Sequence, residues 1–113
     1  MAAAAPIHVS AHFQIDPDHP ALPGHFPGAP IVPGALLLAE GLQQLATPCG
    51  RALACRRIER AKFLMPVAPG TTITATLQLD AGGHGNLDLQ VGRALVAQAT
   101  LVFLPPAHEP ARD

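Results

Sequence analysis

Residues 24–46 hold the most informative pattern of the chain, and they read GHFPGAPIVPGALLLAEGLQQLA. From Gly34 onward the stretch is rich in leucine, alanine and glutamine, which are good helix formers, and Pro33 stands where prolines favour a helix start. Before Pro33, prolines that restrict the backbone alternate with glycines that let a ligand approach the chain closely. The pattern predicts a stiff loop that carries His25 into an apolar helix. Such rigidity suits a catalytic base.

The expected helix start at Gly34 is a second candidate functional feature. The first N–H groups of a helix have no partner inside the helix, and together they carry roughly half a positive charge. Gly34 has no side chain that would keep a substrate away from them. We therefore expect these N–H groups to polarise a carbonyl oxygen.

Apolar and polar residues alternate along much of the remaining chain. Apolar residues from Ile7 to Ile15 alternate with polar ones, which predicts a half-buried strand with His8 and His12 on its polar face. A strand removes the helical geometry that a metal-binding pair at this spacing would need. Further strands are predicted over 57–64, 71–80, 87–91 and 94–104, with turns at 68–70 and 82–86. This order predicts an α+β protein whose antiparallel sheet wraps a single helix.

We expect residues 1–113 to form a single domain with a polar tail from about residue 105. The connection from Pro17 to Pro33 holds six prolines, and it is expected to be an ordered functional loop without regular structure. The run Thr47-Pro48-Cys49-Gly50 predicts the end of the helix.

Composition favours an oligomer and excludes some partners. Charged residues make up 13% of the chain and hydrophobic residues 49%, which indicates an apolar face that meets a partner. A formal net charge of −1 gives no reason to expect nucleic acid. The basic residues between Arg51 and Lys62 have two interpretations, a docking site for an acidic carrier protein or a solvated strand edge.

The cysteines and the N-terminus point to a reduced, soluble protein. Cys49 and Cys55 are six positions apart without nearby histidines, a spacing that fits neither a zinc site nor a disulfide framework. The first residues lack the features of an export signal, and the apolar run around Leu36 is too short to span a bilayer. We expect a cytoplasmic protein that does not enter the membrane.

Taken together, these segments resemble the 3-hydroxyacyl-acyl-carrier-protein dehydratases of the hotdog fold. The resemblance covers nearly the whole chain. It rests on His25-Phe26-Pro27-Gly28, Pro30, Pro33-Gly34, the helix that follows, Arg60-Ala61-Lys62-Phe63, Pro66-Val67, Pro69-Gly70 and the strand ending at Phe103. It implies an antiparallel sheet around one long central helix, a homodimer or a heterodimer with a related hotdog subunit, and an acyl tunnel along the subunit interface.

The resemblance also implies a reaction and its residues. Water would be lost from a 3-hydroxyacyl thioester on the phosphopantetheine of an acyl-carrier protein, giving a trans-2-enoyl thioester in fatty-acid, polyene or polyketide biosynthesis, without metal or other cofactor. His25 matches the family's base, and imidazoles exchange protons readily near neutral pH. Gly34 matches the position whose N–H binds the thioester carbonyl. Phe26 and Gln43 are the further substrate-binding candidates.

The acid is where this chain departs from the family. Fourteen residues after His25, where the family has Asp or Glu, the chain has Ala39, and Glu40 follows one residue later. Gln43 keeps the family's helix glutamine position, so the carboxylate has moved about 100° round the helix. Glu40 either serves as the general acid from this displaced position or is only a polar residue on a flank of the helix.

Three functions remain open at this point. The first is the dehydratase reaction itself. The second is a non-catalytic or weakly active subunit that completes a heterodimeric dehydratase, because loss of an acid lowers rates by roughly a hundred- to ten-thousandfold. The third is a hotdog thioesterase, against which the His25-Phe26-Pro27-Gly28 loop argues.

Overall fold

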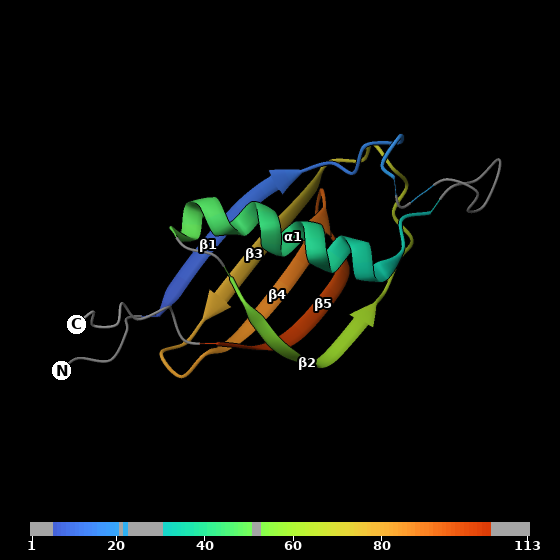
Figure 1. The fold of residues 1–113 in the computed structure, drawn as a ribbon. Helices are drawn as coiled ribbons and strands as arrows, with labels where there is room; N and C mark the ends of the chain where they lie inside the picture. Colours follow the sequence, from blue (N-terminus) through green and yellow to red (C-terminus); the bar gives the residue numbers. More distant parts are fainter. Residues whose placement is uncertain (1–5, 21, 23–30, 51–52, 105–113) are drawn as a thin grey trace.

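The computed structural model describes residues 6–20, 22, 31–50 and 53–104. It contains one helix and one five-stranded sheet in the strand order β1-β3-β4-β5-β2, with every neighbouring pair antiparallel. Helix α1 lies across one face of the sheet (Figure 1). The elements are β1 (Ile7–Phe13), α1 (Gly34–Cys49), β2 (Cys55–Phe63), β3 (Ile73–Leu79), β4 (His84–Val91) and β5 (Ala94–Phe103). The predicted α+β architecture, with a sheet around a single helix, is confirmed.

The core lies between α1 and the inner face of the sheet. Alternation works as predicted on β3, where every second side chain is buried. Gly41 lets the helix approach closely, because a Cβ at this position would lie 3.2 Å from Cδ2 of Leu89. The residues buried between helix and sheet include Leu37, Leu38, Leu45, Ile73, Ala75, Leu77, Leu87, Leu89, Val96, Ala97, Ala99 and Leu101.

The outer face of β1 and β3 is polar. Nδ1 of His12 lies 2.9 Å from Oγ1 of Thr74, and Ser10 Oγ lies 3.3 Å from Thr76 Oγ1. These cross-strand pairs tie the edge strand to its neighbour. His8 and His12 are therefore polar-face residues as predicted, and no group of three possible metal ligands occurs within the described residues.

One predicted boundary is confirmed and another is wrong. The helix ends at Cys49, inside the predicted run Thr47-Pro48-Cys49-Gly50, with Pro48 in its last turn. Gly50 ends the helix in a left-handed conformation, φ 80°, and its N–H donates to the carbonyls of Ala46 and Thr47.

The turn predicted over residues 82–86 is wrong, because β4 already begins at His84. Asp80 closes a shorter turn, in which its Oδ1 accepts hydrogen bonds from the N–H groups of Gly82 at 2.8 Å and His84 at 2.9 Å. The His84 hydrogen bond is the main cause of a lowered pKa at Asp80.

Strand β2 forms an exposed edge of the sheet. All nine of its residues are exposed, whereas α1 packs mainly on β1 and β3. Apolar side chains on and after β2 are also open to solvent, with Ile58 at 51%, Phe63 at 50%, Leu64 at 53% and Met65 at 48% exposure. Such an edge has unpaired backbone groups that can join a strand from another chain.

In the part of the chain that the structure describes, no helix has the length and apolar character needed to cross a membrane.

Cys49 and Cys55 are both free thiols. Partial burial raises the pKa of the Cys55 thiol, and a backbone hydrogen bond with Arg57 offsets part of that rise. The protonated thiol can also donate a hydrogen bond of 3.4 Å from Sγ to the Arg57 carbonyl. The raised pKa disfavours a nucleophilic thiolate at Cys55.

Candidate active site

The start of α1 provides an open site for an anionic or carbonyl oxygen. Pro33 precedes the helix with φ −59° and ψ 142°, and no acidic side chain lies in the first turn. The first hydrogen bonds are donated by Leu36 and Leu37 to the Pro33 carbonyl. The N–H groups of Gly34 and Ala35 therefore precede the hydrogen-bonded ladder and carry the positive end of the helix dipole.

A groove of about 650 Å³ lies beside this helix start. The segment after β2 forms its other wall, and the N–H of Val32 donates a 2.8 Å hydrogen bond to the Val67 carbonyl that holds the two walls together. Its lining is almost entirely apolar, which suits a hydrocarbon chain. The lining residues are Ile31, Val32, Pro33, Gly34, Ala35, Leu37, Phe63, Leu64, Met65, Pro66 and Val67.

Phe63 packs directly against the helix start. A Cβ placed on Gly34 would come within 2.7 Å of the Cε1 and Cζ atoms of the Phe63 ring. The absence of a side chain at Gly34 therefore accommodates the ring as well as leaving the N–H accessible. Sequence reasoning missed Phe63 and the following Leu64 and Met65 as lining residues. The sequence signal that could have found these residues is the apolar run directly after the charged residues of β2.

Glu40 contacts the loop that follows β1. Its Oε2 lies 3.6 Å from Nε2 of His19, and the two side chains are about one quarter exposed, 24% and 26%. Sequence reasoning gave no role to His19, since its contact with the helix depends on the folded loop. The structure thus brings Glu40 together with a histidine of its own chain that is not the candidate base.

Ala39 belongs to a different face of α1. Ala35, Ala39 and Gln43 are spaced by four residues, so they form one row along the helix, and all three are exposed in the single chain. Glu40 lies about 100° round the helix from Ala39. Gln43 is therefore open to solvent or to a second subunit, and its role in substrate binding stays a prediction.

His25 and Phe26 lie outside the described residues. The nearest described residues are Leu22 on the N-terminal side and Ile31 on the C-terminal side. Leu22 is buried in the core, 7% exposed. The assignments of His25 as the base and of Phe26 as a substrate-binding residue stay predictions from the sequence.

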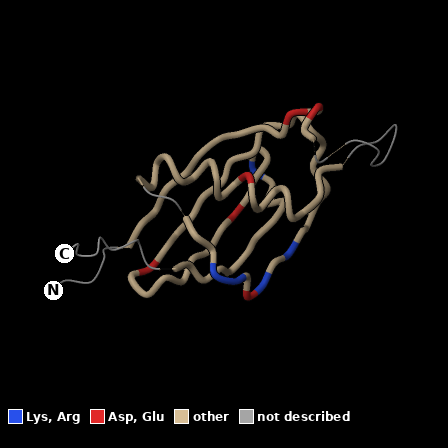
Figure 2. Tube along the Cα trace, in the orientation of Figure 1, with Lys and Arg blue, Asp and Glu red and all other residues tan. Residues whose placement is uncertain are grey.

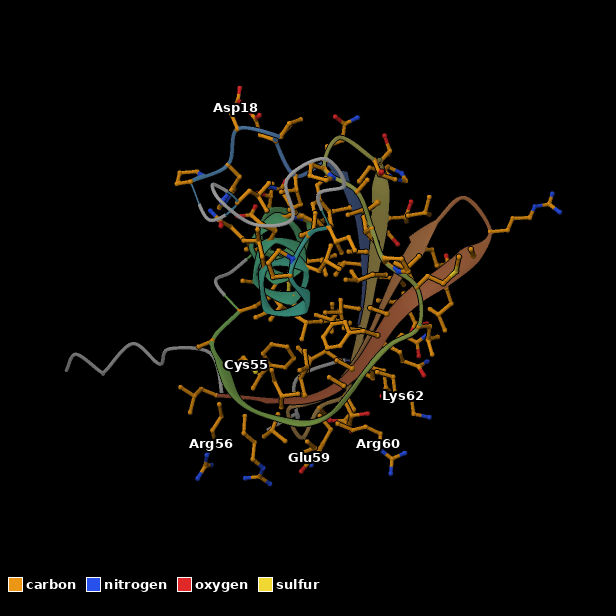
Figure 3. All side chains as sticks on the ribbon, turned by 90° about the vertical axis from the view of Figure 1, so that its right-hand side faces the viewer. Asp18, Cys55, Arg56, Glu59, Arg60 and Lys62 are labelled. Atoms are coloured by element: carbon orange, nitrogen blue, oxygen red, sulfur yellow. The ribbon has the colours of Figure 1, made fainter. Side chains whose placement is uncertain are left out.

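Basic residues gather along β2, as the colouring of the described chain in Figure 2 shows. Arg56, Glu59 and Arg60 project on the side away from α1 (Figure 3). Arg57 is held by Glu59 through an exposed 3.1 Å ion pair. Arg60 and Lys62 also border a polar groove of about 390 Å³ on the outer face of the sheet. The basic edge is therefore separate from the apolar groove at Gly34.

Comparison with known proteins identifies the family. The chain matches the ApeI-like family, described as ApeI dehydratase, over residues 3–100. It is 33% identical over 109 residues to the 3-hydroxyacyl-(acyl-carrier-protein) dehydratase FabZ of Chlamydia trachomatis serovar L2, covering 85% of this chain and 71% of the relative. It is 30% identical over 97 residues to FabZ of Desulforamulus reducens, covering 76% of this chain and 68% of the relative.

The solved structure of the dehydratase heterocomplex ApeI:P from Xenorhabdus doucetiae has the same fold. Its TM-score is 0.74 at 18% sequence identity, and the match covers 93% of this chain and 100% of the other. The hotdog fold predicted from the sequence is thereby confirmed, and so is the predicted family. The chain belongs to the ApeI-like family, among the hotdog-fold relatives of the 3-hydroxyacyl-acyl-carrier-protein dehydratases.

Proposed function

We propose that this protein dehydrates a 3-hydroxyacyl thioester, carried on the phosphopantetheine of an acyl-carrier protein, to the trans-2-enoyl thioester. The observation that carries the proposal is the helix start at Gly34, which opens onto an apolar groove without an acidic side chain in its first turn. Membership of the dehydratase family supports the same reaction. The groove matches an acyl chain in chemical character, and the helix start matches a thioester oxygen.

The reaction needs a base, an oxyanion donor and an acid. His25 would take the α-proton, and the electron pair of that C–H bond would form the new double bond. Negative charge that develops on the thioester oxygen would be stabilised by the Gly34 N–H, a type of contact that contributes about a hundredfold or more in rate. An acid would then protonate the 3-hydroxyl group, so that the C–O bond breaks and water leaves. Phe26 and Gln43 are proposed to contact the substrate.

The source of the acid separates two forms of this proposal. In the first, a homodimer uses Glu40 as its acid. In the second, the chain is a subunit of a heterodimer whose related partner supplies the carboxylate. Two observations favour the second form, the exposed Ala39 at the family's acid position and the 3.6 Å contact of Glu40 with its own His19.

Strand β2 is the proposed subunit interface in either form. Its exposed backbone edge and its apolar residue Ile58 would pair with the equivalent strand of a second subunit. Basic residues on the other face of β2, including Arg60 and Lys62, are proposed to attract the acidic carrier protein. We place the protein in the cytoplasm, where its two free thiols would remain reduced.

The test is an assay of the purified protein with a 3-hydroxyacyl pantetheine thioester. Enoyl product from the protein alone supports the homodimeric dehydratase. Product that forms only after addition of a related hotdog subunit with an acid at the family position supports the heterodimer. Release of free thiol instead would identify a thioesterase, and absence of both products in both conditions would refute the dehydratase proposal.

A further inference from the structure

His19 and Glu40 join the loop after β1 to the middle of α1. Their side chains meet at 3.6 Å although the residues are 21 positions apart in the sequence. The Arg57–Glu59 ion pair, by comparison, joins two residues of the same strand. The His19–Glu40 pair therefore differs in kind, because it fixes a loop against a helix.

His19 lies at the centre of a hydrogen-bonded turn. Its N–H donates to the Asp16 carbonyl at 2.9 Å, and its own carbonyl accepts the N–H of Leu22 at 2.9 Å. Oδ1 of Asp16 accepts the N–H of Asp18 at 2.8 Å, which tightens the same turn. Leu22 then enters the core at 7% exposure. A displacement of His19 would consequently be transmitted to the backbone of Leu22.

The segment with the candidate base begins directly after this turn. His25 is three residues beyond Leu22 in the sequence, and a peptide chain spans at most about 3.5 Å per residue. The position of Leu22 therefore limits the places that the His25 imidazole can reach. This limit follows from chain connectivity alone.

We propose that Glu40 is a positioning residue, which holds the His19 turn on α1 and thereby sets where the chain toward His25 begins. The inference rests on the proposed function, in which His25 is the base. It gives Glu40 a role on the loop side of α1, about 100° round the helix from the exposed row of Ala39. The proton for the leaving hydroxyl group then comes from another group.

Hydrogen exchange tests the anchoring without any substrate. Partly exposed ion pairs add little to global stability, so Glu40→Ala should act locally. We expect the amides of His19 and Leu22 to exchange about fivefold faster in Glu40→Ala, whereas the β3 amides keep their protection. Gln44→Ala is the matched control, because Gln44 is an exposed residue one turn farther along the same helix. Unchanged exchange at Leu22 would overturn the proposal.

Kinetics with the 3-hydroxyacyl pantetheine thioester test the link to catalysis, in the oligomer that proves active. Glu40→Ala and His19→Ala should each lower kcat/KM by about tenfold, and the double variant should be no slower than the slower single variant, because the pair acts as a unit. Both limbs of the pH profile should remain. The Gln44→Ala control should match the wild type.

Two results would count against the positioning role. If Glu40→Ala removed one limb of the pH profile while His19→Ala stayed fully active, Glu40 would be transferring the proton itself. Full activity in both single variants would show that the anchor has no effect on the site. If the wild-type protein forms no enoyl product, alone or with a partner subunit, the proposed function is refuted. The hydrogen-exchange result at Leu22 still tests the anchoring by Glu40, because it needs no substrate.

Discussion

The ring of Phe63 lies against Gly34 so closely that a Cβ on the glycine would approach its Cε1 and Cζ atoms to 2.7 Å. This contact joins the end of β2 to the start of α1. The ring is half exposed, so it has room to move aside when a methyl group is added. The same contact forms one wall of the groove that opens at the Gly34 N–H.

Gly34→Ala should therefore impair activity more than stability. The gain in helix propensity, about 0.5–1 kcal/mol, should nearly offset the clash with a movable ring, whereas the methyl group and the displaced ring narrow the groove. We expect a change of less than about 1 kcal/mol in the free energy of unfolding and a loss of about tenfold or more in kcat/KM. Urea denaturation and the thioester assay measure the two effects.

Gly85→Ala is the control for this prediction. A Cβ on Gly85 would lie 2.8 Å from Cε2 of Phe103, but that ring is only 4% exposed and cannot swing into solvent. The substitution should cost about 1–3 kcal/mol and leave the activity of the folded protein unchanged. If Gly34→Ala were equally destabilising and retained full activity, the groove would not be the substrate site.

His25→Ala should abolish enoyl formation while the protein stays folded and oligomeric. A positioned acid–base group contributes about a hundred- to ten-thousandfold in rate, and we expect the neighbouring prolines of the sequence, rather than the imidazole, to restrict the backbone. The measurements are enoyl formation, light scattering and circular dichroism. A variant with full activity would remove His25 from the mechanism.

Ala39→Glu should raise the activity of the protein without a partner subunit. Position 39 belongs to the exposed row with Ala35 and Gln43, where a carboxylate would face a second subunit instead of His19. We expect an increase of about tenfold or more in the rate of enoyl formation. Gln43→Glu, which adds the same charge one turn later, should give no increase. Equal rates in the wild type and Ala39→Glu would indicate that the chain already has its acid.

Ile58→Glu should dissociate the oligomer. Ile58 is 51% exposed in the single chain, and a carboxylate there would be buried without a partner if β2 forms the subunit interface. Sedimentation should show a shift toward monomer at micromolar protein. Ser10→Glu, on the opposite edge strand of the sheet, should leave the assembly intact. An unchanged assembly in Ile58→Glu would exclude β2 as the interface.

Arg60→Glu should weaken the use of carrier-bound substrate selectively. Arg60 projects from β2 away from α1 and lies outside the apolar groove (Figure 3). We expect KM for the carrier-bound thioester to rise about tenfold, with less effect at high salt, while kinetics with the pantetheine thioester stay unchanged. Arg93→Glu, at the tip of the β4–β5 turn, is the control for net charge. Equal effects on both substrates would argue against carrier docking at Arg60.

The features that were predictable from the sequence are those that leave a local pattern in it. Apolar residues alternate over Ile73–Leu79, which identifies a strand, and the run after Pro33 identifies a helix. Both are readable from the sequence because an element that is buried on one face repeats its apolar residues with a characteristic period. The motif around His25 identified the family for a similar reason, since its residues are contiguous. The helix end was predictable in the same way, because Gly50 supplies the left-handed cap directly after Pro48 and Cys49.

The fold class, the family and the helix start at Gly34 all follow from the amino-acid sequence. The contact of Glu40 with His19, the packing of Phe63 on Gly34 and the position of β2 at an exposed edge are visible only in the folded chain. Each of these relationships joins segments that are distant in the chain. Their distances depend on strand order and on the path of the loops, which the periodicity of a single segment does not encode.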